Sequence, residues 1–111
     1  MTPDKRWPSD WVRAVLPTCI LQAVAGSEAY GYQIIQALKA AGFDGLSGGT
    51  LYPALMKLEQ EGWITSEWGF SDNNRRARYY QITAAGRRAL GAELESWRRF
   101  AAGLEAVLRT T

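Results

Sequence analysis

A cluster of arginines is the first feature of this sequence that could bind a ligand. Residues 69–80 carry three guanidinium groups, those of Arg75, Arg76 and Arg78, against a single carboxylate. Positive charge concentrated at the tip of a hairpin would reach the phosphate backbone or the minor groove of a nucleic acid. The alternative is that the arginines keep a loop soluble or protect the exposed edge of a strand.

A second candidate surface is the polar side of a short helix that follows a run of glycines. Leu51, Leu55 and Leu58 form the apolar side of this helix. The opposite side presents polar and apolar groups from Thr50, Tyr52, Pro53, Met56, Lys57 and Gln60. In a helix–turn–helix, the N-terminal residues of the second helix contact base edges, and that helix end also favours a phosphate. Alternatively, this is a solvated face whose tyrosine packs on a neighbour.

The C-terminal segment carries an apolar seam that could pair two helices. Its members alternate at intervals of four and three residues: Leu90, Leu94, Trp97, Ala101, Leu104 and Leu108. This heptad spacing is typical of helices that pack on one another. A terminal helix of ~27 residues is ~40 Å long, which exceeds what a chain of this size can cover. We therefore expect a second copy of the chain to cover the seam, although the helix could instead fold back on its own core.

Trp97 lies in the middle of this seam, and its position allows two roles. It is either a packing residue or, in a symmetric dimer, one wall of a slot between two chains. Such a slot would suit a planar aromatic effector, with Trp11 and Phe100 as further walls. Trp63 and Trp68 flank the expected first strand and are predicted to be packing residues.

The composition excludes several kinds of active site. The 111 residues include no histidine and one cysteine, Cys19, so a Ser-His-Asp triad, a Cys-His pair and a histidine-ligated zinc site are excluded. The glycines of residues 45–49 lack the lysine of a phosphate-binding loop. No paired carboxylates stand out, and we expect neither an enzyme nor a bound metal or cofactor. Cys19 lies on an apolar helix face and is expected to be a small core residue.

Charge, hydropathy and cysteine content constrain where the protein acts. A lone cysteine cannot form an intrachain disulfide, so a reducing cytoplasm is the expected compartment. The longest charge-free run, residues 14–27, is 14 residues long, fewer than the ~20 that a membrane helix needs. The N-terminus lacks the apolar region of a signal peptide. The net charge is only +2, so nucleic-acid binding depends on how the charges are distributed.

Hydrophobic periodicity predicts the helices that would position these residues. Spacings of three and four predict a first helix over residues 10–25, capped by Asp10 and either kinked or split by Pro17. A second helix is expected over residues 30–41, with Gly42 as its stop.

The third helix should begin near residues 49–50, or at Ser47 with a distortion, because Pro53 is comfortable only in a first turn. It should end at Gly62.

The period of the sequence changes after the third helix. Residues 63–70 and 78–82 alternate aromatic or β-branched side chains with polar ones, and they flank a turn-like stretch at residues 71–74. This pattern predicts a two-stranded hairpin with a long tip. Thr83 is then placed to cap a final helix that runs to about Arg109.

Together these elements predict one domain of the mainly α, α+β class. The order is that of a winged helix–turn–helix with a two-stranded wing and a long C-terminal dimerisation helix. We expect a flexible arm over residues 1–9, the winged helix–turn–helix, which would bind DNA, over residues 10–82, and the dimerisation helix over residues 83–111.

Several stretches of the chain resemble a known family. Residues 30–34 read Tyr-Gly-Tyr-Gln-Ile, residues 49–55 read Gly-Thr-Leu-Tyr-Pro-Ala-Leu, and residues 78–86 read Arg-Tyr-Tyr-Gln-Ile-Thr-Ala-Ala-Gly. These strings resemble the signature of PadR-type transcriptional regulators. The resemblance covers about residues 13–109. The single C-terminal helix is similar to that of the compact PadR subfamily.

The resemblance implies a function that the patterns alone do not give. It implies a homodimeric, ligand-responsive regulator, usually a repressor, that binds an imperfect inverted repeat of double-stranded DNA. By position in the family motif, the DNA-contacting residues would be Tyr30, Tyr32, Thr50, Tyr52, Pro53, Lys57, Arg75, Arg76 and Arg78.

Dimer contacts and an effector site also follow from the resemblance. Two protomers would pair through their first and last helices, which adds Val12 and Leu16 to the seam residues as interface candidates. Trp97 lies at a place comparable to a tryptophan that stacks flat, drug-like molecules in some compact members. A different class of function remains open, in which the same fold docks a partner protein through Tyr52 and the wing. That alternative predicts no salt-dependent affinity for duplex DNA.

Overall fold

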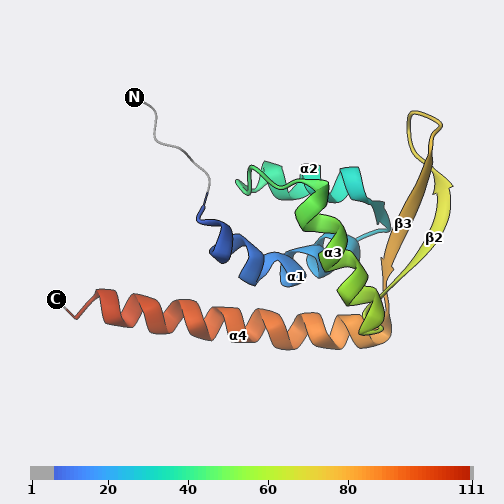
Figure 1. The fold of residues 1–111 in the computed structure, drawn as a ribbon. Coiled ribbons are helices and arrows are strands. Elements are labelled where there is room, and N and C mark those ends of the chain that lie inside the picture. Colours follow the sequence, from blue (N-terminus) through green and yellow to red (C-terminus); the bar gives the residue numbers. More distant parts are fainter. Residues whose placement is uncertain (1–6, 111) are drawn as a thin grey trace, which may run out of the picture.

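The structure is a computed structural model that describes residues 7–110. Its elements are α1 (Ser9–Ala25), β1 (Ala29–Tyr30), α2 (Gly31–Ala40), α3 (Gly48–Gln60), β2 (Ile64–Phe70), β3 (Arg76–Ile82) and α4 (Ala84–Leu108). Helices α1 to α3 form a body, the β2–β3 hairpin projects from one end of it, and α4 runs along the body (Figure 1). This arrangement confirms the predicted winged helix–turn–helix with a C-terminal helix.

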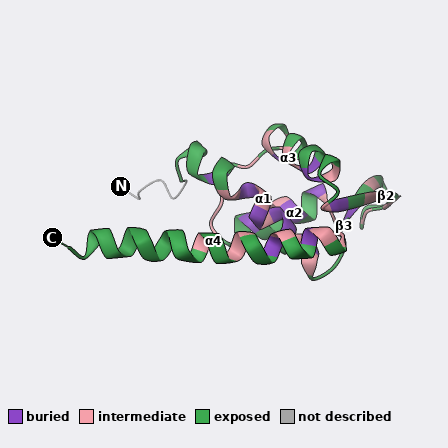
Figure 2. Ribbon diagram, turned by 90° about the horizontal axis from the view of Figure 1, so that it is seen from below, coloured by how far each residue is buried: buried purple, intermediate pink, exposed green. Residues whose placement is uncertain are grey.

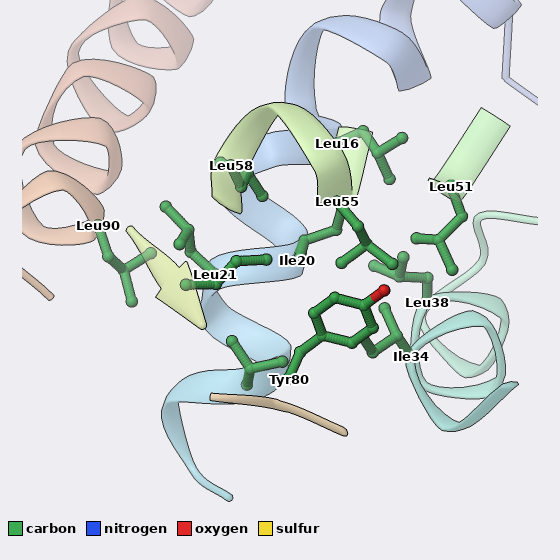
Figure 3. Close-up of a cluster of buried hydrophobic side chains, with 12 residues drawn as sticks. Leu16, Ile20, Leu21, Ile34, Leu38, Leu51, Leu55, Leu58, Tyr80 and Leu90 are labelled. Atoms are coloured by element: carbon green, nitrogen blue, oxygen red, sulfur yellow. The ribbon is translucent and has the colours of Figure 1, made fainter. Parts of the chain in front are cut away.

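The core lies where α1, α2, α3 and the base of the sheet meet. Its apolar members recur on one side of each helix, as the helical period requires. The side chains that are less than 2% exposed are Ile20, Leu21, Ile34, Leu51, Leu55 and Ile64. Figure 3 shows the Tyr80 ring among these aliphatic side chains, with Leu90 of α4 at the edge of the cluster.

The start of α1 differs from the prediction. Pro8 occupies the N-cap and Ser9 already begins the helix, so the prediction that Asp10 caps it is wrong. Asp10 lies within the first turn, where a negative charge is favourable, and its carboxylate pairs with Arg13 at 3.2 Å. Of the arm predicted over residues 1–9, residues 1–6 lie outside the described residues.

Two prolines lie inside helices rather than at their ends. Pro17 is within an unbroken α1, so the alternative that it splits the helix is wrong. Helix α3 begins at Gly48, which puts Pro53 in its second turn instead of its first. Each proline removes one backbone hydrogen bond. Burial of neighbouring side chains, such as Leu16 and Leu55, offsets that loss.

Glycines end α2 and α3 as predicted. Gly42 and Gly62 have φ angles of 101° and 78°, which disfavour residues with a side chain. At the end of α2, the Gly42 N–H donates to the Lys39 carbonyl and the Phe43 N–H donates to the Leu38 carbonyl, both at 3.0 Å. Two equivalent hydrogen bonds form at the C-terminus of α3, so both helices end at defined residues.

The sheet contains one strand more than predicted. Strands β2 and β3 pair antiparallel from Ile64 opposite Ile82 to Phe70 opposite Arg76, so β3 begins two residues before its predicted start. The two-residue β1 pairs with the other edge of β3, giving the order β1-β3-β2. A strand of two residues is too short to show alternation, which is why the sequence did not reveal it.

The junction between the wing and α4 is closely packed. Thr83 caps α4 as predicted, because its hydroxyl accepts from the Gly86 N–H at 2.9 Å. The same hydroxyl donates to the Gly62 carbonyl at 2.7 Å. A Cβ on Gly86 would lie 2.0 Å from the Trp63 carbonyl oxygen, so only glycine fits there. Across residues 7–110, the helices lack the length and apolar content of a membrane span.

Candidate nucleic-acid interface

A groove between the start of α2, the start of α3 and the wing gathers most of the predicted DNA-contacting residues. Its volume is about 760 Å³. Six of the nine predicted residues line it: Tyr30, Tyr32, Tyr52, Arg75, Arg76 and Arg78. Chain segments more than forty residues apart in the sequence thus meet on one surface. We call it the wing groove.

The other three predicted residues lie on a different flank of α3. Thr50, Pro53 and Lys57 line a second groove, of about 710 Å³, between α1, α3 and the start of α4. The helical geometry explains the division. Each residue of an α-helix is rotated by about 100° from the one before it, so Lys57, five residues after Tyr52, is rotated by about 140° from it. Tyr52 and Lys57 therefore point to opposite flanks of the helix.

Tyr52 is held in place by the glycines beside it. A Cβ on Gly31 would lie 2.4 Å from the Tyr52 hydroxyl, and one on Gly48 would lie 3.2 Å from its ring. The side chain nevertheless remains 50% exposed toward the wing groove. Tyr52 thus packs on a neighbour and also presents a surface to the groove, whereas its contact with DNA stays a prediction.

The start of α2 places two tyrosines at the groove. The Gln33 side chain accepts a hydrogen bond from the Tyr30 N–H at 3.1 Å, which satisfies one of the free amides at this helix end. The Tyr30 ring packs edge-on against Tyr79 of β3, with 5.2 Å between ring centroids. Tyr32, in the first turn of α2, is mostly exposed. One tyrosine is therefore fixed to the sheet, and the other is free to contact a ligand.

The arginines of the wing surround an exposed tryptophan. The guanidinium carbons of Arg76 and Arg78 lie 4.5 Å and 5.2 Å from the centre of the Trp68 ring. Trp68 is 57% exposed and lines the wing groove, so the prediction that it is a packing residue is wrong. Trp63, by contrast, packs against the core as predicted. The signal that could have separated the two is strand alternation, which puts Trp68 on one sheet face with Arg76 and Arg78.

Burial raises the pKa values of three groups, those of Tyr79, Tyr80 and Cys19. Burial raises the pKa of the Tyr80 phenol at the base of the wing groove, although the Arg78 guanidinium acts in the opposite direction. Tyr80 therefore stays a neutral hydrogen-bonding group near neutral pH. Burial also raises the pKa of the Cys19 thiol, which agrees with the prediction of an unreactive residue packed against the core.

The sequence and the fold both have counterparts among known proteins. A sequence model of the PadR-like family of transcriptional regulators matches residues 20–92, which include every residue of the wing groove. The chain belongs to the PadR family. It is 40% identical over 81 residues to the transcriptional regulator Rv3488 of Mycobacterium tuberculosis, which covers 73% of this chain and 74% of that protein.

Solved PadR structures share the fold over nearly the whole chain. A PadR-like transcriptional regulator from Bacillus cereus superposes with a TM-score of 0.82 at 28% identity, covering 92% of this chain and 99% of the other. A PadR family regulator from Eggerthella lenta gives 0.81 at 28% identity, covering 93% and 89%. These relatives are regulators of transcription and not enzymes, so the prediction of a non-enzymatic PadR regulator is confirmed.

The last helix of this PadR regulator divides into two halves. Leu90 and Leu94 pack on the chain's own core, as do Val12 and Leu16 of α1, which are 8% and 2% exposed. The second half of the seam is exposed (Figure 2), including Ala101, Leu104 and Leu108. Contacts of all these residues with a second chain stay a prediction.

Trp97 lies at the boundary between the two halves. Its indole N–H donates to the Thr18 hydroxyl at 3.1 Å, and that hydroxyl donates to the Glu93 carboxylate at 3.3 Å. Phe100 packs edge-on against the indole at 5.7 Å between centroids. Trp11 instead stacks on Trp7 at 6.3 Å and is mostly exposed. Trp97 is thus half-buried against its own α1, and the predicted effector slot stays a prediction.

Proposed function

We propose that the chain is a sequence-specific repressor that binds double-stranded DNA as a homodimer on an inverted-repeat operator and responds to a small ligand. The observation that carries this proposal is the wing groove, in which Tyr30 of β1, Tyr32 of α2 and Tyr52 of α3 meet three arginines from the wing. Arginines hold phosphates, whereas side chains at the start of a recognition helix contact base edges. A repressor must reach its DNA, and the compartment that we propose for this chain is the cytoplasm.

Footprinting on the chain's own upstream promoter tests the sequence-specific part. We expect protection of an inverted repeat whose half-site centres lie about one helical turn, or a multiple of it, apart. Tyr52→Ala should change the preference among operators, whereas Arg75→Ala should weaken all duplexes similarly. If the chain shows no affinity for duplex DNA that decreases with salt concentration, the alternative is favoured, in which Tyr52 and the wing dock a partner protein.

The second half of α4 supports the homodimer. Its apolar side chains point to one side of the helix and are more than half exposed: Phe100, Leu104, Val107 and Leu108. A contiguous apolar stripe of this kind is a frequent mark of a protein interface. The occupant that fits best is the same stripe of a second copy, because the heptad spacing is self-complementary. Light scattering at micromolar concentration should give twice the chain mass, and a monomer would contradict the proposal.

The surroundings of Trp97 support a planar aromatic effector. The hydrogen bond to Thr18 fixes the orientation of the half-buried indole, and the accessible part of its ring could stack on a planar ligand. In a symmetric dimer, a ligand between two such rings would change the angle between the C-terminal helices and so the spacing of the α3 helices. Tryptophan fluorescence with flat dyes, repeated on Trp97→Ala, tests this. An unchanged dye affinity with the dimer intact would contradict an effector site at Trp97.

A further inference from the structure

Trp68 is placed unusually for a large aromatic residue. It lies on the outer part of the wing, where Arg78 is its direct partner across the hairpin and Arg76 lies diagonally from it. Both guanidinium groups lie within 5.2 Å of the ring centre, at a cation–π distance. The ring is 57% exposed, so burial does not explain its presence.

The sheet face that holds Trp68 changes character along its length. Near the helices it carries Ile64 and Ile82, which belong to the core or pack against it. Farther out it carries Ser66 and Tyr80, and then Trp68 with the two arginines. The hydrophobic core therefore ends before Trp68 is reached, and the indole has no large part in holding the fold together.

A cation–π contact with the indole leaves the N–H donors of a guanidinium group available for hydrogen bonds. A guanidinium that lies over an indole uses its flat face, whereas its N–H donors point outward in the plane of the group. Those donors can still form paired hydrogen bonds with phosphate oxygens. An arginine that is already held by a ring also loses less side-chain freedom when it binds.

We propose that Trp68 is a positioning residue that holds Arg76 and Arg78 ready to contact the DNA backbone. This inference rests on the proposed DNA-binding function and adds to it the group that orders the wing. The indole itself supplies no charge, so its removal leaves the number of neutralised phosphates unchanged. Its loss affects how often both arginines occupy the binding geometry.

The test is a salt titration of affinity for a mixed-sequence DNA duplex, measured by fluorescence anisotropy. Trp68→Ala and Trp68→Leu should each weaken binding by about three- to tenfold, with the slope of log affinity against log salt unchanged. Trp68→Phe keeps a π face and should recover most of the affinity. Arg76→Ala should weaken binding and also reduce the magnitude of the slope by about two in a dimer, because each protomer loses one phosphate contact.

Thr65→Ser is the control. Thr65 is an exposed residue of the same strand whose side chain lies on the opposite sheet face from Trp68 and the two arginines, and its replacement should leave affinity and slope as they are. Thermal unfolding should give closely similar melting temperatures for all variants, since neither Trp68 nor Thr65 belongs to the core.

The outcomes separate the two proposals. If the unaltered chain shows no salt-dependent duplex affinity, the proposed function fails and this inference fails with it. If the unaltered chain binds and Trp68→Ala binds equally well, only the positioning role is overturned. Two other results would also overturn the positioning role. A salt slope of smaller magnitude in Trp68→Ala would mean that the indole acts through charge, and full affinity in Trp68→Leu would mean that it acts through apolar bulk.

Discussion

The wing groove and the second half of α4 differ in how many of their contacts form within one chain. In the wing groove, residues from α2, α3 and the hairpin meet within a single protomer, and Trp68 and Tyr52 are held by their neighbours. The second half of α4 presents Leu104, Val107 and Leu108 to solvent, and each of these side chains is more than half exposed. The proposed DNA-binding surface is thus assembled by the fold of one chain, whereas the proposed dimer contact of the α4 stripe needs a second chain.

The two halves of α4 give the largest expected contrast. Leu90 is 7% exposed within the core, so Leu90→Asp should lower the free energy of unfolding by about 4 kcal/mol or more and leave the chain largely unfolded. Leu104 is 52% exposed, so Leu104→Asp should keep the fold and yield monomers. Circular dichroism and light scattering distinguish the two results. A folded dimer of Leu104→Asp would remove this stripe from the interface.

The junction that joins the two regions should be the next most sensitive point. Gly86→Ala would push a methyl group into the Trp63 carbonyl and should lower the free energy of unfolding by about 1–3 kcal/mol. Gly91, one and a half turns farther along α4, has open space around its Cα, so Gly91→Ala should stabilise the helix by about 0.5–1 kcal/mol. Chemical denaturation measures both. Equal effects would mean that the junction is not tightly packed.

The wing groove can be altered without disturbing α4. Gly31→Ala would force the Tyr52 ring away from α2, because a Cβ there would lie 2.4 Å from its hydroxyl. We expect a change of about tenfold in affinity for the best operator, with little change in the free energy of unfolding. Gly26→Ala, at a position with open space, is the control and should change neither. Unchanged operator affinity in Gly31→Ala would show that the position of Tyr52 is unimportant for DNA.

The cap of α4 should give the smallest effect. Thr83→Ala removes the hydroxyl that accepts from the Gly86 N–H and should lower the free energy of unfolding by about 1 kcal/mol. Thr83→Ser keeps a hydroxyl and should retain most of that stability. Thermal unfolding of the two variants measures the difference. If both variants melt together, the methyl group of Thr83 and not its hydroxyl stabilises the junction.

Local signals predicted most of the fold. Leucines at helical spacing, the stops at Gly42 and Gly62 and the cap at Thr83 act over a few residues, so the sequence reveals them directly. The start of α1 and the strand β1 were not predicted correctly, and the sequence left open whether Pro17 splits the first helix. The strand β1 forms by pairing with β3, a segment far along the chain, which no local pattern shows.

The candidate site was predictable in its residue types but not in its grouping. The helical period alone could have separated Tyr52 from Lys57, although which flank faces the wing depends on how α3 packs. The role of Trp68 depends on hairpin register, which sets Arg78 opposite it. Contacts of the α4 stripe with a second chain lie beyond what one chain determines.

We claim that the wing groove is the surface that faces DNA, so the loss of a charge there should affect binding more than the loss of a charge elsewhere. A dimer in which Arg75, Arg76 and Arg78 of each wing groove contact phosphates should bind a duplex with a log–log salt slope of about −5. Arg75→Ala should weaken binding and reduce the magnitude of that slope by about two. Arg88→Ala removes an exposed charge of α4, outside the wing groove, and should change neither. Equal losses in both variants, or a loss in Arg88→Ala alone, would contradict the claim.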